Sequence, residues 1–218
     1  MRIAIFDNEG VLVRSDWDSV SNTISKCLGV PYESGNDLKR RFKLWKDGPD
    51  NPLDIYGRGP EHMTSDTFWD IVLREAYQAQ STPERINMLS SVMRTLTSIV
   101  NEESIGLVKE LKNAGHKVFM LSNAIPEITQ GNQRHGYYAL FDKCYISWRI
   151  GHKKPTREAY ETLLSSEGLD AVDCFLVDDT PKNVEAARSL GMGGMVYTLG
   201  DDFAALRNTL RDYGFLVR

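Results

Sequence analysis

Hydrophobic and polar positions follow two different patterns along the 218 residues of the chain. Residues 101–218 alternate between short apolar runs and segments whose apolar positions lie three or four residues apart. The first pattern is typical of buried strands and the second of amphipathic helices, so the alternation predicts an α/β fold with a parallel sheet. The predicted strands span residues 117–121, 143–147, 174–177 and 194–198, and the predicted helices span residues 104–114, 126–133, 156–166, 180–190 and 203–213.

A further strand is predicted at residues 3–6, a run that is too short and too apolar for a helix. Asp7 and Glu9 follow this strand, and Gly10 then allows a sharp turn. In open parallel sheets, chemistry collects at the carboxyl ends of the strands. Carboxylates that are desolvated there require an offsetting charge, and a metal ion is the usual candidate.

Residues 15–100 show amphipathic helical patterns but no convincing buried strand. Thr82 is a candidate N-cap, because Pro83 is suited to the first helical position after it. We therefore predict a core domain formed by residues 1–14 and 101–218, interrupted by a helical cap domain at residues 15–100. The predicted helices of the insertion are residues 17–28, 36–45, 65–79 and 83–99, and the segment 47–63, rich in Gly and Pro, is predicted to be a loop.

Composition narrows the possible partners and location. The formal net charge of -4 gives no reason to expect nucleic acid or an anionic membrane as a partner. The basic run at residues 39–43 is interpreted as a solvated helix face. No apolar run approaches membrane-spanning length, and the first strand begins too early to leave room for a cleaved signal. The three cysteines lack metal-ligand spacing and are interpreted as reduced core residues, so we expect a cytoplasmic protein.

Polar residues also follow the other predicted strands or precede the helices after them. A carboxylate nucleophile, a hydroxyl, an ammonium and an acidic pair together suit phosphoryl transfer. Asp7 would attack phosphorus, and Mg²⁺ held by Asp7 and Asp179 would reduce the repulsion between anions. Ser122 and Lys154 would hold the equatorial oxygens of the phosphoryl group. The candidate residues beyond Asp7 and Glu9 are Ser122, Asn123, Lys154, Asp178, Asp179 and Asn183.

In order along the chain, these residues resemble the four signature motifs of the haloacid dehalogenase-like hydrolases. The resemblance implies a Rossmann-like three-layer core with a central parallel sheet and an inserted all-helical cap. The motifs look most like those of the epoxide-hydrolase-linked phosphatases and the bacterial sugar-1-phosphatases. The four matches are Asp7-Asn8-Glu9-Gly10-Val11, Ser122, Lys154-Pro155, and Asp178-Asp179 followed by Asn183.

The resemblance implies a Mg²⁺-dependent hydrolase of small phosphomonoesters that works through an aspartyl-phosphate on Asp7. Its partner would be a small phosphorylated metabolite, and the protein would be a monomer or a homodimer. Asn183 would orient a metal-bound water or cap a helix. The implied phosphate-binding residues are Ser122, Asn123 and Lys154, and the implied metal ligands are Asp7, Glu9 through its backbone carbonyl, Asp178 and Asp179.

Glu9 departs from the family pattern, in which phosphatases carry Asp at this position as the general acid and base. Glutamate has the same chemistry, but its carboxyl group stands one methylene further from the backbone. Proton transfer depends on hydrogen-bond reach, so we expect activity that is slow.

Three alternatives stay open. A 2-haloacid dehalogenase would attack carbon and needs no metal, and the pair Asp178-Asp179 argues against it. A phosphomutase would pass the phosphoryl group to a sugar instead of water. A catalytically impaired binding protein is conceivable because of Glu9.

Overall fold

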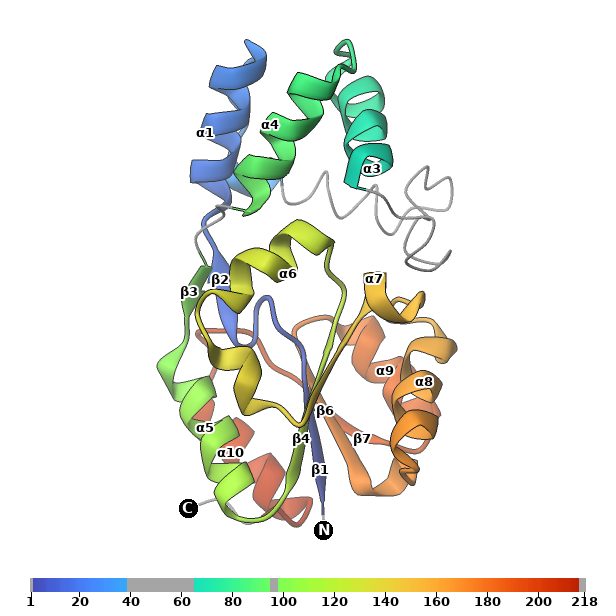
Figure 1. Ribbon diagram of the computed structural model, residues 1–218. Helices are drawn as coiled ribbons and strands as arrows, with labels where there is room; N and C mark the ends of the chain where they lie inside the picture. Colours follow the sequence, from blue (N-terminus) through green and yellow to red (C-terminus); the bar gives the residue numbers. More distant parts are fainter. Residues whose placement is uncertain (1, 39–64, 95–97, 216–218) are drawn as a thin grey trace.

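A five-stranded parallel sheet forms the centre of the fold, as the sequence predicts (Figure 1). The computed structural model describes residues 2–38, 65–94 and 98–215. Strand order is β5-β4-β1-β6-β7, and every neighbouring pair is parallel. The first strand of the sequence therefore lies in the middle. The strands are β1 (Ile3–Phe6), β4 (Lys117–Ser122), β5 (Lys143–Ile146), β6 (Cys174–Asp178) and β7 (Gly193–Val196).

Helices cover both faces of the sheet, which gives the core three layers (Figure 1). Ala4 and Phe6 of β1 join the apolar cluster under α5 and α10, whereas Ile3 and Ile5 join the cluster under α8 and α9. Successive side chains of a strand point to opposite faces, so a central strand must be apolar at every position. The covering helices are α5 (Glu102–Asn113), α8 (Arg157–Glu167), α9 (Pro181–Ser189) and α10 (Phe203–Asp212).

Shorter helices complete the core. The predicted helix at residues 126–133 is present as α6, which begins with Pro126 in its first turn. The other short helices were not indicated by the sequence pattern, because three or four residues carry too little periodicity. The short helices are α6 (Pro126–Gln133), the 3₁₀ helices η3 (Tyr137–Leu140) and η4 (Ala171–Asp173), and α7 (Ser147–Ile150).

Helices α1, α3, η2 and α4, which we call the insertion helices, lie together beyond the carboxyl end of the sheet (Figure 1). Their apolar cluster includes Val20, Trp69 and Leu89, and it extends to Ile125, the residue before α6. The insertion helices therefore pack directly on the core. Their bounds are α1 (Trp17–Leu28), α3 (Ser65–Ile71), which continues as the π-helix η2 (Val72–Ala76), and α4 (Pro83–Arg94).

Two short antiparallel strands connect the insertion helices to the core. β2 (Val13–Ser15) precedes α1 and β3 (Ser98–Val100) follows α4, and we call this pair the neck. The prediction of one helix over residues 83–99 was wrong at its end, because Ser98 and Ile99 belong to the strand β3. Three residues give no periodic signal, and their conformation depends on pairing with a strand that is distant in sequence.

Several local predictions can be compared with the structure. Pro83 begins α4, and the backbone N–H of Arg85 donates to Thr82 Oγ1 at 3.4 Å, which confirms the predicted start. Residues 35–38 are helical, but the rest of the predicted helix 36–45 and the predicted loop 47–63 lie outside the described residues.

Cys174 is buried, whereas Cys27 is exposed, so the prediction of a core residue was wrong for Cys27. In the described part of the chain, no helix is long and apolar enough to cross a membrane.

Candidate active site

Asp7 lies at the carboxyl edge of the sheet, directly after the last residue of β1. Its backbone N–H donates to the carbonyl of Val177 at 2.9 Å, which continues the pairing of β1 with β6. The next residue of β6 is Asp178, so parallel pairing brings these two acids side by side. Ser122 ends β4 on the other flank of β1 and is buried. The sheet thus places three predicted site residues along one edge.

Asp7, Asp178 and Asp179 form a cluster of carboxyl groups, which we call the acidic cluster. One carboxyl oxygen of each lies within 4.8 Å of those of the others. Asp7 is 8% exposed and Asp178 is fully buried. The pKa of Asp7 is raised to about 7, mainly because the group is buried; Lys154 opposes this rise, and the neighbouring Asp178 and Asp179 contribute to it. A buried carboxyl group beside like charges is typical of functional sites.

Lys154 supplies the positive charge inside this cluster. Its side chain is 1% exposed, and Nζ lies 2.9 Å from Asp7 Oδ1 and 2.5 Å from Asp178 Oδ2. Burial alone would lower the pKa of Lys154, but the two carboxylates outweigh it and raise the pKa above its ordinary value. Of the two adjacent lysines, the structure therefore brings Lys154 into the acidic cluster, as the sequence predicts.

Asp178 and Asp179 have different environments although they are adjacent. Asp178 Oδ1 accepts from the backbone N–H of Thr180 and from Asn183 Nδ2, each at 2.9 Å, and Oδ2 accepts from Lys154. These contacts fix the orientation of the Asp178 carboxyl group, which in turn holds the ammonium group of Lys154. Asp179 is partly exposed, and its Oδ1 accepts from Thr180 Oγ1 at 3.0 Å. Asn183 contacts Asp178 and not Asp179, so it supports the buried acid of the pair.

Gly10 makes room for Asp179. A Cβ atom built at Gly10 would lie 2.4 Å from Asp179 Oδ2, and the backbone of Gly10 has φ +89°, which side chains disfavour. The glycine of the first motif therefore serves both the turn after β1 and the approach of a carboxyl group from the loop after β6. A cation bound between these two loops would need the Asp179 carboxyl group to come this close to the loop after β1.

The residues present fit a hard divalent cation. The acidic cluster offers carboxylate oxygens, which are the ligands that Mg²⁺ prefers. Three acids against one buried lysine leave an excess of negative charge, and a cation would offset it.

Asn123, a predicted phosphate-binding residue, contacts the backbone of Lys154. Its Nδ2 donates to the carbonyl of Lys154 at 2.8 Å, and its Oδ1 accepts from the backbone N–H of Lys154 at 2.9 Å. This reciprocal pair ties the end of β4 to the loop that carries the lysine. Asn123 therefore positions Lys154 in this structure.

The carboxyl group of Glu9 contacts the neck rather than the acidic cluster. Its Oε2 accepts from Ser15 Oγ at 2.6 Å, and its Oε1 accepts from the backbone N–H of Ser15 at 3.1 Å. Ser15 belongs to β2 of the neck, so the Glu9 carboxyl group is held at the connection to the insertion helices. The longer side chain of glutamate is consistent with this reach.

Two further contacts were missed by sequence reasoning. Ser15 follows no motif, and only the folded neck places it beside Glu9. Tyr137 Oη donates to Asn8 Oδ1 at 2.8 Å, and both residues are buried. This bond supports the loop between Asp7 and Glu9. The sequence gives no signal for this contact, because Asn8 lies between two acids after the apolar strand and Tyr137 is distant in the chain.

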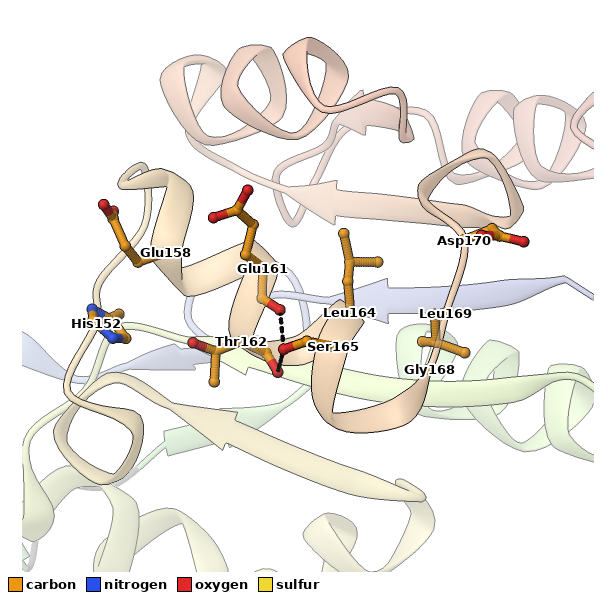
Figure 2. Close-up of a pocket in the computed structure, with 9 residues that line it drawn as sticks. All are labelled: His152, Glu158, Glu161, Thr162, Leu164, Ser165, Gly168, Leu169 and Asp170. Atoms are coloured by element: carbon orange, nitrogen blue, oxygen red, sulfur yellow. Dashed lines mark hydrogen bonds between the residues drawn. The ribbon is translucent and has the colours of Figure 1, made fainter.

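A hollow elsewhere on the core does not include the acidic cluster. Figure 2 shows it along α8, with His152 and Glu158 at one end and Leu169 and Asp170 at the other. His152 lies two residues before Lys154, but the lysine does not line this hollow. The candidate chemistry therefore lies at the sheet edge, and His152 is a lining residue of a separate surface.

Comparison with known proteins identifies the class. The sequence matches the haloacid dehalogenase-like hydrolase family over residues 1–191. The chain therefore belongs to this family, as its motifs predict, and it is a hydrolase with an α/β fold.

Three relatives show how far the likeness extends. Sesquiterpene phosphatase astK of Aspergillus oryzae is 37% identical over 93 residues, which are 42% of this chain and 47% of that protein, so the matched stretch spans about half its length. Phosphatase MT3486 of Mycobacterium tuberculosis is 25% identical over 190 residues, 86% of this chain and 83% of that protein. The solved structure of the HAD family enzyme bt-2542 from Bacteroides thetaiotaomicron, in complex with magnesium and inorganic phosphate, has a TM-score of 0.68 at 19% identity and covers 94% of this chain and 98% of its own. This structural likeness concerns the fold.

Proposed function

We propose that the chain is a Mg²⁺-dependent hydrolase of small phosphomonoesters, with Asp7 as the nucleophile. The observation that carries the proposal is the buried contact of Asp7 with Lys154 inside the acidic cluster. A carboxylate nucleophile needs an ammonium or a cation beside it, because both the nucleophile and the phosphate are anions. Relatives that are named phosphatases support the same reaction type.

The chain's own residues divide the reaction into two steps. Asp7 attacks phosphorus, the bond from phosphorus to the alcohol oxygen breaks, and Glu9 gives its proton to the departing oxygen. Water then attacks the phosphorus of the aspartyl-phosphate, Glu9 takes the proton, and Asp7 is released together with inorganic phosphate. Lys154 and Ser122 hold phosphoryl oxygens during both steps.

Glu9 must leave Ser15 before it can act in this way. Its carboxyl group is bonded to the side chain and the backbone of Ser15 in this structure. Rotation about its side-chain bonds would turn the carboxyl group toward the leaving oxygen. The need to break two hydrogen bonds is a physical reason to expect slow turnover.

Mg²⁺ would be held by the carboxylates of Asp7 and Asp179, with Asp178 as their neighbour and the backbone carbonyl of Glu9 as a further ligand. When bound, the ion supplies positive charge that offsets the repulsion between phosphate and the carboxylate nucleophile. Asn183 fixes Asp178, and through it Lys154, so that the ammonium stays in place when charge moves.

Selectivity would come from the insertion helices, which we propose to be a cap domain over the sheet edge. The partner would be a small phosphorylated metabolite, and the protein a monomer or a homodimer. Because one relative is named a sesquiterpene phosphatase, the substrates tested should include an isoprenoid monophosphate beside sugar phosphates.

A direct assay tests the proposal. Purified protein should release phosphate from p-nitrophenyl phosphate with Mg²⁺, lose this activity with a chelator, and bind beryllium fluoride at Asp7. Asp7→Asn should abolish turnover. Equal turnover by that variant would overturn the mechanism. Halide release that ignores the chelator would indicate a dehalogenase, transfer of phosphate to a sugar would indicate a mutase, and absence of both turnover and beryllium fluoride binding would indicate a binding protein.

A further inference from the structure

Helix α6 has an unusual buried side, because its buried residues are polar or glycine. They are Glu127, Thr129, Gly131 and Asn132. Helices in globular proteins normally bury an apolar stripe. Burial of polar side chains costs free energy unless hydrogen bonds compensate it, so the partners of these residues indicate what the helix holds.

At its first turn, α6 holds two of the insertion helices. Glu127 is 2% exposed. Its Oε1 accepts from Trp69 Nε1 of α3 at 3.1 Å and from Ser90 Oγ of α4 at 2.9 Å. Figure 1 shows α6 lying between the insertion helices and the sheet. The Glu127 carboxyl group therefore fixes α3 and α4 to a helix of the core.

At its last turn, α6 holds the neck. Asn132 Oδ1 accepts from Ser98 Oγ of β3 at 2.6 Å, and Ser98 Oγ lies 3.4 Å from Ser15 Oγ of β2. Ser15 in turn donates to Glu9 Oε2 at 2.6 Å. Each hydroxyl gives its single proton elsewhere, so Ser15 and Ser98 meet as packed partners in the register of β2 and β3. Two hydrogen bonds, joined by the strand pairing of the neck, thus connect Asn132 to Glu9.

We propose that α6 is a positioning helix that couples the placement of the insertion helices to the orientation of Glu9. Glu127 and Asn132 are its positioning residues, and each acts through other side chains. A helix of eight residues is about 12 Å long and moves as a unit, so a shift at its first turn is felt at its last. Displacement of α3 and α4 would shift Ser15, and with it the orientation from which the Glu9 carboxyl group must reach the leaving oxygen. The part of this inference that concerns turnover rests on the function proposed above.

The first test needs no catalysis. The indole N–H signal of Trp69 in a ¹H–¹⁵N spectrum, assigned with Trp69→Phe, reports the contact with Glu127. Ser98→Ala removes the hydroxyl that bonds Asn132, at the opposite end of α6 from Trp69. We expect Ser98→Ala to shift the Trp69 signal, whereas Gln130→Ala, at an exposed position of α6, leaves it in place. A Trp69 signal that is the same in both variants overturns the coupling.

The second test measures turnover. Glu127→Gln keeps an acceptor oxygen, whereas Glu127→Leu has similar volume and no acceptor. We expect Glu127→Leu to lower kcat by about tenfold and Glu127→Gln to stay close to the parent, because reach at the reacting atoms is steeply sensitive to position. Asn132→Leu should lower kcat too. The double variant Glu127→Leu/Asn132→Leu should lose little more than the stronger single variant, since both act through one helix.

The outcomes separate the two proposals. Additive losses in the double variant, with each protein folded by circular dichroism, would mean independent supports and would overturn the coupling. If the parent protein hydrolyses no phosphomonoester, the proposed function fails, while the Trp69 signal in Ser98→Ala still decides the coupling. If a leucine variant does not fold, Ser98→Ala carries the kcat measurement, and an unchanged kcat there counts against the inference.

Discussion

Replacement of Lys154 by methionine would test the charge balance of the acidic cluster. Methionine keeps the length of the side chain and removes its charge. Lys154 is buried, and its Nζ contacts Asp7 Oδ1 at 2.9 Å and Asp178 Oδ2 at 2.5 Å. At this separation and an effective dielectric constant near 20, one pair of unit charges interacts by about 6 kcal/mol before desolvation is counted. The loss of one partner from a buried pair typically costs about 3–5 kcal/mol.

We therefore expect Lys154→Met to lower the free energy of unfolding by about 3–5 kcal/mol at pH 8 in the presence of a chelator. Urea unfolding followed by circular dichroism measures this change. Added Mg²⁺ should recover more stability in the variant than in the parent protein, because the ion then meets three carboxylates that no ammonium offsets. Turnover should fall even where Mg²⁺ restores the fold.

Lys153→Met is the matched control, since Lys153 is adjacent in sequence and carries the same charge. Its effect should stay below about 1 kcal/mol, as for ordinary ion pairs near a surface. Equal losses of stability in the two variants would refute the assigned charge balance. An equal gain in stability on adding Mg²⁺ to Lys154→Met and to the parent protein would also refute it.

Three further predictions concern the same site. Glu9→Gln should lower kcat by about 10²–10⁴-fold while beryllium fluoride still binds at Asp7, because only proton transfer is lost; full activity in this variant would remove Glu9 from the mechanism. Gly10→Ala should weaken Mg²⁺ binding measured by calorimetry, since the new Cβ would lie 2.4 Å from Asp179 Oδ2. An unchanged Mg²⁺ affinity would contradict a role of this close approach in metal binding. Because burial raises the pKa of Asp7 to about 7, protons should compete with the ion, and Mg²⁺ affinity should fall by up to about tenfold per pH unit below pH 7; an affinity that is flat from pH 5 to 8 would contradict this.

The convergence of the site could be predicted from the sequence, because parallel strands share one carboxyl edge. Asp7, Ser122 and Asp178 each end a short apolar run or follow it directly, so their meeting requires only that the sheet be parallel. Lys154 was harder to assign, since its neighbour is also a lysine. The buried contact with Asp7 distinguishes the two, and it depends on the loop held by Asn123.

The orientation of Glu9 could not be predicted in the same way. The motif gives the position of its backbone, but the direction of its carboxyl group depends on Ser15, which the neck brings close. The neck itself depends on β3, a strand of three residues whose partner is distant in the chain. Side-chain torsions and long-range pairing of this kind leave no periodic trace in the sequence.

The neck has a consequence for how such chains can change over time. Because Val13 pairs with Val100, the segment between them leaves the core and returns to it at one place. A longer, shorter or wholly different excursion costs little extra closure entropy. New ligand preferences can therefore be grafted at this junction while Asp7, Asp178 and Asp179 keep their positions at the sheet edge.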